Sequence, residues 1–101
     1  MHARVSTYTG EAERLLDGFQ AATGPLEKIE GFSQAYFLVD RANNKAISIT
    51  FWETEDALLA SAAQADELRK GATEPSGSTI GSVEHYDVAL TASAGKDAVN
   101  S

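Results

Sequence analysis

The sequence predicts an α+β domain with the element order βαββαβ, the ferredoxin-like or split βαβ arrangement of a four-stranded antiparallel sheet with two helices on one face. Three observations favour this fold. Residues 45–52 alternate β-branched and aromatic side chains, and the acidic stretch 53–56 then changes the pattern from strand to helix. A second strand pattern, at residues 32–40, precedes it across a short turn. An apolar stripe with helical spacing occupies residues 12–22.

The N-terminal part of the chain is expected to form a strand and then a helix. Residues 3–9 alternate in the manner of a strand that is partly buried on both faces. Residues 10–23 form the helix, whose apolar stripe consists of Ala12, Leu15, Leu16, Phe19 and Ala22. Thr9 or Gly10 is expected to cap its start. The Gly-Pro pair at 24–25 is expected to end it, because proline cannot extend a helix.

Residues 32–40 and 45–52 are expected to pair as an antiparallel hairpin, because the turn between them is short. Asn43 and Asn44 suit this turn, since asparagine tolerates a positive φ and makes local hydrogen bonds. The strand 45–52 places Ile47, Ile49 and Phe51 on one face, and Ser48, Thr50 and Trp52 on the other. A strand with apolar groups on both faces is typical of the middle of a sheet.

The second helix is expected to span residues 54–70, capped by Thr54 and closed by Gly71. Its buried stripe consists mainly of small residues. Such a helix either packs close to its neighbour or leaves space above the sheet.

Residues 72–82 are rich in Gly, Ser, Thr and Pro and are expected to form a loop. The last strand follows at residues 83–91. One domain therefore covers residues 1–91, and residues 92–101 are expected to be a disordered C-terminal tail, because they show no periodicity.

Right-handed crossovers bring the first and third strands to the centre of the sheet. The helices can cover only one face, and either choice leaves large apolar side chains bare on the other. An uncovered patch of this kind usually marks an interface. We therefore expect a homodimer that packs through the sheet face across a two-fold axis. The alternative is a monomer with an unusually apolar exposed sheet.

The composition limits the choice of partners and location. The chain has 101 residues and a net charge of −7, from 15 acidic and 8 basic side chains. This charge disfavours nucleic acids and anionic membranes as partners. There are no cysteines, which excludes disulfides and thiolate metal sites and fits a reducing compartment. With no signal-peptide pattern and no apolar run of ~20 residues, a cytoplasmic location is the expectation. No cluster with metal-ligand spacing is present.

Residues 46–57, 31–36 and 83–88 together resemble the antibiotic biosynthesis monooxygenase (ABM) family, whose members are dimeric α+β barrels. The most specific feature is the strand that ends in Trp52-Glu53 and leads into a helix. The resemblance covers residues 3–91. It implies the fold predicted above and a homodimer. The superfamily also holds quinol monooxygenases, haem-degrading enzymes and members with no known reaction, so the activity stays open.

The resemblance also indicates a site. Trp52 matches the family's tryptophan, which in relatives lines a pocket between sheet and helices; the alternative is that Trp52 fills the core beside Leu58. The haem-degrading branch needs a histidine on the second helix and an asparagine on the first strand. This chain has Ala62 or Ala63, and Ala3, at those positions. We therefore expect no haem and no other cofactor.

The candidate pocket residues are Trp52, Tyr36, Tyr86 and His85. The two tyrosines are able to donate hydrogen bonds to a quinone oxygen. His85 titrates near neutrality, although a lone strand histidine is more often structural. Arg4 is able to pair with a phenolate, or else lies at the rim of a partner.

The function expected from the resemblance is binding of a small aromatic or polyketide-like ligand, with cofactor-independent monooxygenation of a quinol- or anthrone-type substrate. This chemistry needs a flat apolar slot, a polar group that helps the phenol to lose its proton, and a dry pocket in which the anion meets oxygen. The alternative is a non-catalytic, dimeric ligand-binding or accessory protein.

Overall fold

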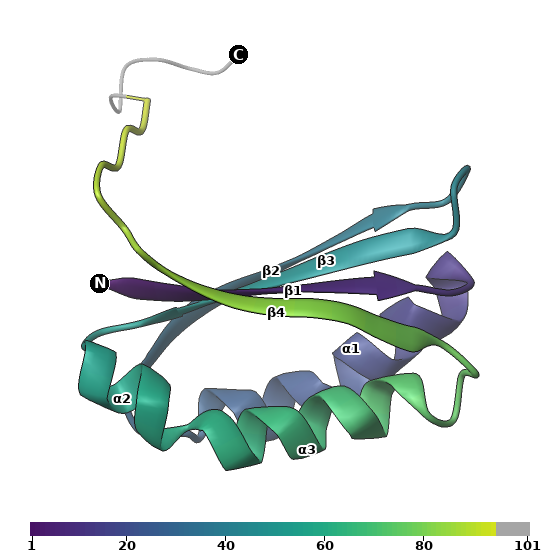
Figure 1. Cartoon of the computed structure of the whole chain (residues 1–101), viewed down its shortest axis with the longest axis horizontal. Coiled ribbons are helices and arrows are strands. Elements are labelled where there is room, and N and C mark those ends of the chain that lie inside the picture. Colours follow the sequence, from purple (N-terminus) through teal and green to yellow (C-terminus); the bar gives the residue numbers. More distant parts are fainter. Residues whose placement is uncertain (95–101) are drawn as a thin grey trace.

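The computed structural model describes residues 1–94, so residues 95–101 of the predicted tail lie outside the described residues. In chain order the elements are β1 (His2–Thr9), α1 (Ala12–Glu27), β2 (Phe32–Asp40), β3 (Lys45–Trp52), α2 (Glu55–Ala60), α3 (Ala62–Thr73) and β4 (Thr79–Asp87). Within this part of the chain, the strands form one sheet and the helices lie on the same side of it (Figure 1). The predicted ferredoxin-like α+β fold is confirmed.

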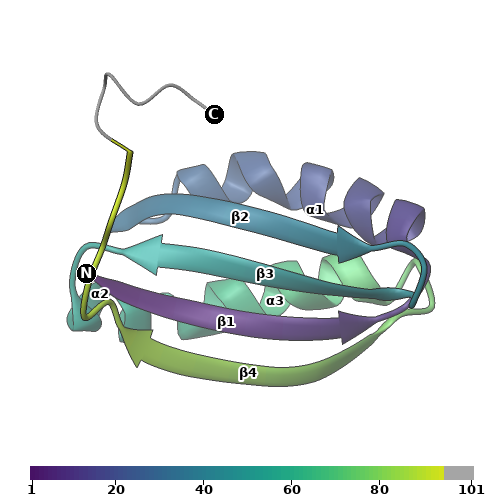
Figure 2. The ribbon, with the colours of Figure 1, turned by 90° about the horizontal axis from the view of Figure 1, so that it is seen from above.

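The strands follow the order β2-β3-β1-β4, with every neighbouring pair antiparallel (Figure 2). The first and third strands are central, and β2 and β3 form the expected hairpin with Tyr36 opposite Ile49. Residue Val5 of β1 also lies opposite Ile49. The registers therefore place Val5, Ile49 and Tyr36 side by side on one face of the three neighbouring strands.

The helices cover one face of the sheet and leave the other face uncovered. The inner face, toward the helices, buries Ser48, Thr50 and Trp52 of β3. The outer face carries Ile47, Ile49 and Phe51, which are half-buried, and β2 adds Tyr36 and Leu38, which are about half exposed at 53% and 49%. Trp52 thus points toward the helices, and the aliphatic face of the sheet is the uncovered one.

The core between sheet and helices has two parts. Tyr8, Leu15, Phe19, Ala46 and Ala72 form one cluster, and Leu26, Trp52 and Leu58 form the other. Helices α1 and α3 touch near Gly18, where an added Cβ would lie 2.5 Å from the carbonyl oxygen of Ala72. A residue without a side chain is therefore needed at this crossing.

The predicted end of the first helix is wrong, because α1 continues through Pro25 to Glu27. Proline disfavours the helical conformation of the residue before it partly through that residue's Cβ. Gly24 has no Cβ and is free of neighbours, so the helix continues. The predicted cap is also displaced. The backbone N–H of Gly10 donates to the Asn44 carbonyl oxygen at 2.9 Å, so the N-cap position moves to Glu11.

The second helix is divided in two at Ser61, whereas the sequence suggested one segment closed by Gly71. Thr54 is the N-cap as predicted, and its side chain accepts from the N–H of Ala57 at 3.0 Å. At the break, the Ser61 hydroxyl donates to the Leu58 carbonyl oxygen at 2.7 Å. This side-chain bond competes with the regular helical pattern and accounts for the division.

The last strand lies earlier than residues 83–91. The partner strand β1 begins at His2, which pairs with Asp87, and its other end pairs Thr9 with Thr79. The length of β1 therefore sets the bounds of β4, and just beyond them the Val88 N–H donates to the Met1 carbonyl oxygen at 2.9 Å.

Candidate functional site

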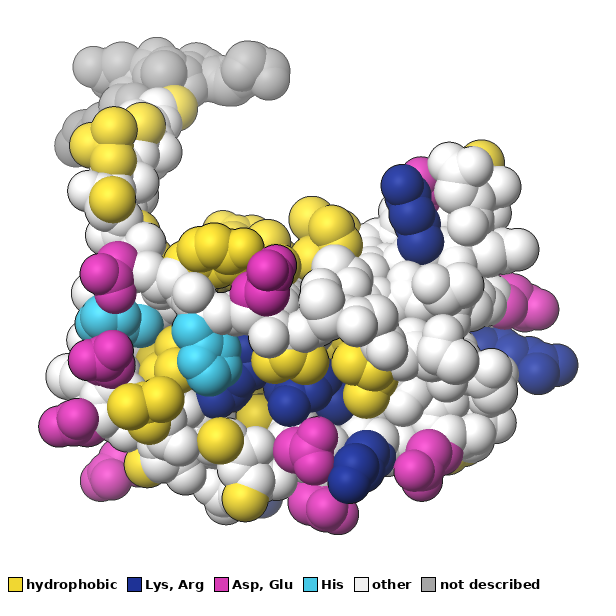
Figure 3. Space-filling model, in the orientation of Figure 1, with side chains coloured by type: hydrophobic (Ala, Val, Ile, Leu, Met, Phe, Trp, Pro, Cys, Tyr) yellow, Lys and Arg dark blue, Asp and Glu magenta, His cyan; other side chains and the backbone are white. Residues whose placement is uncertain are grey.

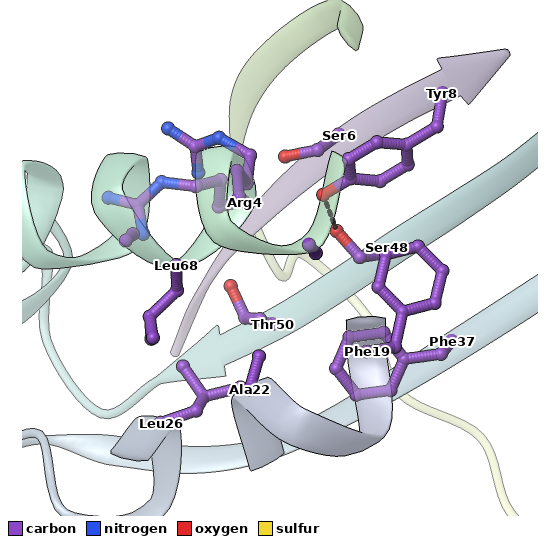
Figure 4. Close-up of a pocket in the computed structure, with 13 residues that line it drawn as sticks. Arg4, Ser6, Tyr8, Phe19, Ala22, Leu26, Phe37, Ser48, Thr50 and Leu68 are labelled. Atoms are coloured by element: carbon purple, nitrogen blue, oxygen red, sulfur yellow. Dashed lines mark hydrogen bonds between the residues drawn. The ribbon is translucent and has the colours of Figure 1, made fainter. Parts of the chain in front are cut away.

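A cavity lies between the inner face of the sheet and helices α1 and α3, with a volume of about 40 Å³ (Figure 4). Its lining has an apolar part that includes Phe19, Leu26, Phe37 and Leu68, and a polar part made of Arg4, Ser6, Tyr8, Ser48, Thr50 and Arg69. An apolar enclosure with a few convergent polar groups is the usual form of a small-molecule site.

The polar part comes from the alternation of β1 and β3. Every second residue of each strand faces the helices. The register pairs Arg4 with Thr50 and Ser6 with Ser48, so that these side chains meet on one face. Opposite them α3 presents alanines, which leave the space open. The small residues expected on the second helix therefore do leave space above the sheet.

The apolar part is built around two phenylalanines. Phe19 of α1 and Phe37 of β2 stack with ring centroids 4.9 Å apart and planes 25° apart. The ring of Tyr8 meets Phe19 edge-on at 5.1 Å. Figure 4 shows the two phenylalanines on the opposite side of the cavity from Arg4. This wall is suited to a flat ring.

The hydroxyl groups of Tyr8 and Ser48 lie 2.8 Å apart and are buried. Burial raises the pKa of Tyr8 above its ordinary value. The phenol therefore stays protonated at neutral pH, and it is a hydrogen-bond donor rather than a base.

Arg4 is 3% exposed, and three of its N–H groups donate hydrogen bonds to neutral partners. Its Nη2 donates to the Leu58 carbonyl oxygen at 2.7 Å, and its Nη1 to the Ser61 hydroxyl at 3.2 Å. Its Nε lies 3.4 Å from Nε2 of His85, which accepts. The guanidinium carbon is 5.6 Å from the centre of the Trp52 ring, within reach of a cation–π attraction.

Arg69 brings a second guanidinium to the cavity from α3. Its Nη2 lies 3.6 Å from Oδ1 of Asp66, and its Nε is buried without a hydrogen-bond partner in residues 1–94. Burial and the nearby Arg69 lower the pKa of Arg4 to about 10. The pKa of His85 is also lowered, by burial first and then by the two arginines. The polar part of the cavity is thus a positively charged region, beside which His85 is neutral.

Trp52 is fully buried and packs with Leu58 and Leu26. Its Nε1 donates to Oγ1 of Thr50 at 2.9 Å, and Phe32 meets its ring edge-on at 5.6 Å. Trp52 touches the cavity through Thr50 and Arg4 rather than forming its wall. A direct role of Trp52 in ligand binding stays a prediction.

Tyr36 and Tyr86 lie on the outer face of the sheet, which does not border the cavity. Tyr36 contacts Phe51 edge-on at 6.1 Å, and Tyr86 donates to the Glu84 carboxylate at 3.0 Å. His85 lies at the rim, beside Arg4. The structure therefore brings Trp52 and His85 to the two sides of Arg4 and leaves the two tyrosines apart from them.

The structure also places the three alanines that stand where the haem-degrading branch is expected to have its histidine and asparagine. Ala62 and Ala63 are exposed at the start of α3, and Ala3 faces outward opposite Phe51. Within residues 1–94, the cavity lining contains no histidine and no asparagine.

Sequence reasoning missed Tyr8, Ser48 and Arg69 as site residues. A signal was present for the first two, since polar residues alternate on the same face of both central strands. Arg69 had none, because its direction depends on where α3 begins, and that is set by the break at Ser61.

Comparison with known proteins identifies a family that this chain matches. The family model described as antibiotic biosynthesis monooxygenase matches residues 1–73. No curated protein matches the chain. None of the helices in residues 1–94 combines the length and the apolar character needed to cross a bilayer.

Several solved structures share the fold. SnoaB, a cofactor-independent oxygenase from Streptomyces nogalater, is 21% identical over 89% of this chain and 94% of its own, with a TM-score of 0.72. The haem degrader MhuD from Mycobacterium tuberculosis is 18% identical over 92% of this chain and 100% of its own, with a TM-score of 0.71. The ActVA-Orf6 monooxygenase of Streptomyces coelicolor, solved with nanaomycin D, is 17% identical over 91% and 92%, with a TM-score of 0.61.

At these identities the likeness to solved structures concerns the fold alone. The match of the family model extends over β1 to the end of α3 and so includes every residue of the cavity lining named above. The chain belongs to the antibiotic biosynthesis monooxygenase family.

Proposed function

We propose that this protein binds a flat aromatic or polyketide-like molecule in the cavity between sheet and helices and oxidises it with molecular oxygen, without a cofactor. The main support for the proposal is that the cavity, in a chain of this family, has an apolar wall on one side and positively charged and polar groups on the other. The stacked pair Phe19 and Phe37 forms a wall for a ring, and Arg4, Tyr8 and Arg69 supply positive charge and a neutral donor.

The chemistry starts from a quinol or anthrone that loses a proton. The resulting anion gives electrons to dissolved oxygen and forms a carbon–oxygen bond. Protonation gives a hydroperoxide, which loses water and leaves a new carbonyl group. One oxygen atom enters the product and the other leaves in water. The electrons come from the substrate itself, so the scheme balances without a further reductant.

The side chains of the cavity fit the first step. The field of Arg4 and Arg69 stabilises a phenolate or enolate, and a low local dielectric strengthens this effect. Tyr8 stays protonated and is able to donate to the developing negative oxygen. No carboxylate lines the cavity in the described part of the chain, so charge stabilisation, rather than a carboxylate base, favours proton loss.

The cavity must widen to take such a substrate. Its volume of about 40 Å³ suits a few waters, whereas small-molecule sites span roughly 300–1,000 Å³. We expect α3 to move away from the sheet, since it follows the break at Ser61 and faces the cavity with small residues such as Ala65.

We also propose that two copies pair through the outer face of the sheet. Figure 3 shows hydrophobic side chains gathered along that face, which includes Tyr36, Leu38 and Phe51. Patches of this kind usually mark interfaces. The lack of cysteines fits the expected cytoplasmic location, which stays a prediction.

The test uses the fluorescence of Trp52, the one tryptophan of the chain. Its ring lies next to Arg4 and Thr50, so a ligand in the cavity should change its emission. We expect saturable quenching with anthrone or 1,4-naphthalenediol, and oxygen uptake of one molecule per molecule oxidised. Absence of quenching with both compounds would contradict the proposal.

A matched pair of variants locates the site. Ala65→Leu fills the cavity and should abolish quenching and oxygen uptake, at a cost of about 1–3 kcal/mol in stability. Ala63→Leu places the same side chain on the exposed side of α3 and should change neither. Equal activity of the two variants would place the reaction elsewhere.

A second candidate function is ligand binding without turnover. The absence of a carboxylate or histidine from the cavity lining of residues 1–94 favours it, because no side chain there is an evident base at neutral pH. Quenching without oxygen uptake would support this function over the first.

A further inference from the structure

The cavity contains more positive charge than the protein neutralises. Arg4 is almost fully buried, yet its partners are a carbonyl oxygen, a hydroxyl and a neutral imidazole. No carboxylate contacts Arg4 within residues 1–94. Buried arginines are normally paired with an acid, because removing a charge from water is costly.

Arg69 increases this imbalance. Within residues 1–94 its one acidic neighbour is Asp66, which lies 3.6 Å away and is shared with Lys70, whose Nζ is closer at 3.2 Å. The Asp66 side chain is 46% exposed, so its charge is well screened. The Nε of Arg69 is buried and unused in the described residues. Two guanidiniums therefore line one cavity, and within residues 1–94 the one carboxylate near either of them is the half-exposed Asp66, which Lys70 shares, in a chain whose net charge is −7.

Arg4 and Arg69 both line the cavity, and the charge of each affects the pKa of neighbouring groups there. Arg69 lowers the pKa of Arg4, and both lower the pKa of His85. Figure 3 shows basic side chains set in the hollow between β4 and α3, next to a histidine. A negative group in the cavity would relieve the repulsion between the two cations.

We propose that the molecule bound in this cavity is an aromatic carboxylic acid, with its carboxylate between Arg4 and Arg69 and its ring against Phe19 and Phe37. This assignment rests on the proposed function and specifies its substrate class. A carboxylate fits better than a larger anion, because Arg4 has already used three of its five N–H groups on protein partners and retains two, which match two oxygens.

The arrangement of the lining supports this orientation. Arg4 and the two phenylalanines lie on opposite sides of the cavity (Figure 4). A carboxylate fixed at the first would direct a fused ring system toward the second. The same anchor would present a ring hydroxyl to Tyr8, on the strand that also carries Arg4.

The experiment compares two probes that differ in one group, 1,4-dihydroxy-2-naphthoic acid and its primary amide. Both have the same rings and nearly the same size, but only the acid carries a carboxylate at neutral pH. Affinities are measured by calorimetry on the 101-residue chain. We expect the acid to bind about tenfold tighter than the amide or more, as hydrogen bonds to a charged group predict.

Variants test the assignment to the arginines. Arg69→Met keeps the length of the side chain and removes its charge, and it should reduce the preference for the acid to about threefold or less without weakening the amide. Arg69→Lys should retain part of the preference. Arg14→Met, at an exposed position of α1, is the matched control and should retain all of it. Circular dichroism confirms that each variant is folded, and Arg69→Gln replaces the methionine variant if that one unfolds.

The outcomes separate the two proposals. Equal binding of acid and amide overturns the carboxylate and leaves the aromatic site intact. Failure of both probes to bind overturns the proposed function as well. A preference for the acid that is unchanged in Arg69→Met overturns the role of Arg69.

Discussion

Arg4 joins three parts of the molecule. It lies on β1, it binds the Leu58 carbonyl and the Ser61 hydroxyl where α2 meets α3, and it lies over the Trp52 ring. A ligand that attracts this guanidinium would compete with its bonds to the helices. The same side chain is therefore placed to link occupancy of the cavity with the position of α3.

The first prediction at the residue scale concerns the contribution of the Tyr8 hydroxyl to stability. Tyr8→Phe removes a buried hydrogen bond and leaves the Ser48 hydroxyl without this partner, so we expect a loss of about 1 kcal/mol in the free energy of unfolding near neutral pH. Urea titration of both proteins measures it. Ser48→Ala should cost a similar amount, and a double variant should cost less than the sum, because the two residues share one bond.

The pH dependence of that difference follows from the raised pKa of Tyr8. The folded protein holds the phenolic proton more tightly than the unfolded chain. The stabilisation is therefore fully present below the unfolded pKa of about 10 and is lost as the pH rises above it. Wild type and Tyr8→Phe should differ less at about pH 11 than at about pH 8. A constant difference would contradict the assignment of a buried phenol.

Gly18 supports a second residue-scale prediction. Gly18→Ala places a Cβ against the backbone of Ala72 and should destabilise the protein by about 1–3 kcal/mol. Gly71→Ala is the control, because it is helical and has open space around it. It should stabilise the protein by about 0.5–1 kcal/mol. Thermal unfolding of both variants is the measurement.

Residue roles were harder to predict than residue positions. Alternation along β3 assigned the faces of Trp52 and Ile49, because a strand has only two. It does not tell which face carries a ligand. Tyr36 and Tyr86 have suitable chemistry for a quinone, yet the register places them on the outer face. The positive charge of the cavity depends on Arg69, whose direction no local pattern encodes.

At the scale of the element, the hairpin was predicted with its bounds and the start of the second helix with its cap, Thr54, whereas the end of α1 and the break at Ser61 were not. Strands β2 and β3 end where the apolar alternation ends, and their short turn fixes the register. The end of α1 depends on Gly24 relieving the constraint of Pro25. The Ser61 hydroxyl at the break also accepts a hydrogen bond from Arg4, which lies 57 residues away in the chain. Contacts between distant segments are not visible in local sequence patterns.

The hairpin turn supports an element-scale prediction. Asn44 has a φ of 52°, and Asn43 instead uses its side chain to donate to the Asp40 carboxylate at 2.9 Å. Asn44→Val should destabilise the hairpin by about 1–2 kcal/mol, since a β-branched residue is strained in the left-handed region. Asn44→Gly is the matched change and should be nearly neutral. Denaturant titration compares them, and equal losses would mean that side-chain contacts, not backbone strain, set the choice of asparagine.

At the scale of the whole molecule, the two faces of the sheet differ in what borders them. Its inner face forms the cavity, and its outer face has no cover in residues 1–94 other than its own side chains. The sequence predicted that one face is covered by the helices and that the other needs a partner, because neither set of alternating residues on β3 is typical of a solvent-exposed surface. Which partner covers the outer face is a matter of association, which the sequence of one chain does not determine.

The proposed homodimer leads to a prediction at the scale of the whole molecule. The wild-type protein should show a mass near twice 10.7 kDa in sedimentation experiments at micromolar concentration. Ile49→Lys places a charge at the centre of the outer face and should give a monomer that stays folded. Leu59→Lys, at a position of α2 that is 54% exposed, should leave the dimer unchanged. A monomeric wild type would contradict the proposed interface.

The backbone contact at Gly18 also limits the shape of molecule that can enter. It clamps the far end of α3 against α1, whereas at the near end the helix is held through the side chain of Arg4. We expect any separation of the two helices to be hinged at Gly18 and to be widest beside Arg4. We expect a flat ring system to enter edge-first from the Arg4 end and to come to rest with its rings below Tyr8 and its carboxylate beside Arg4.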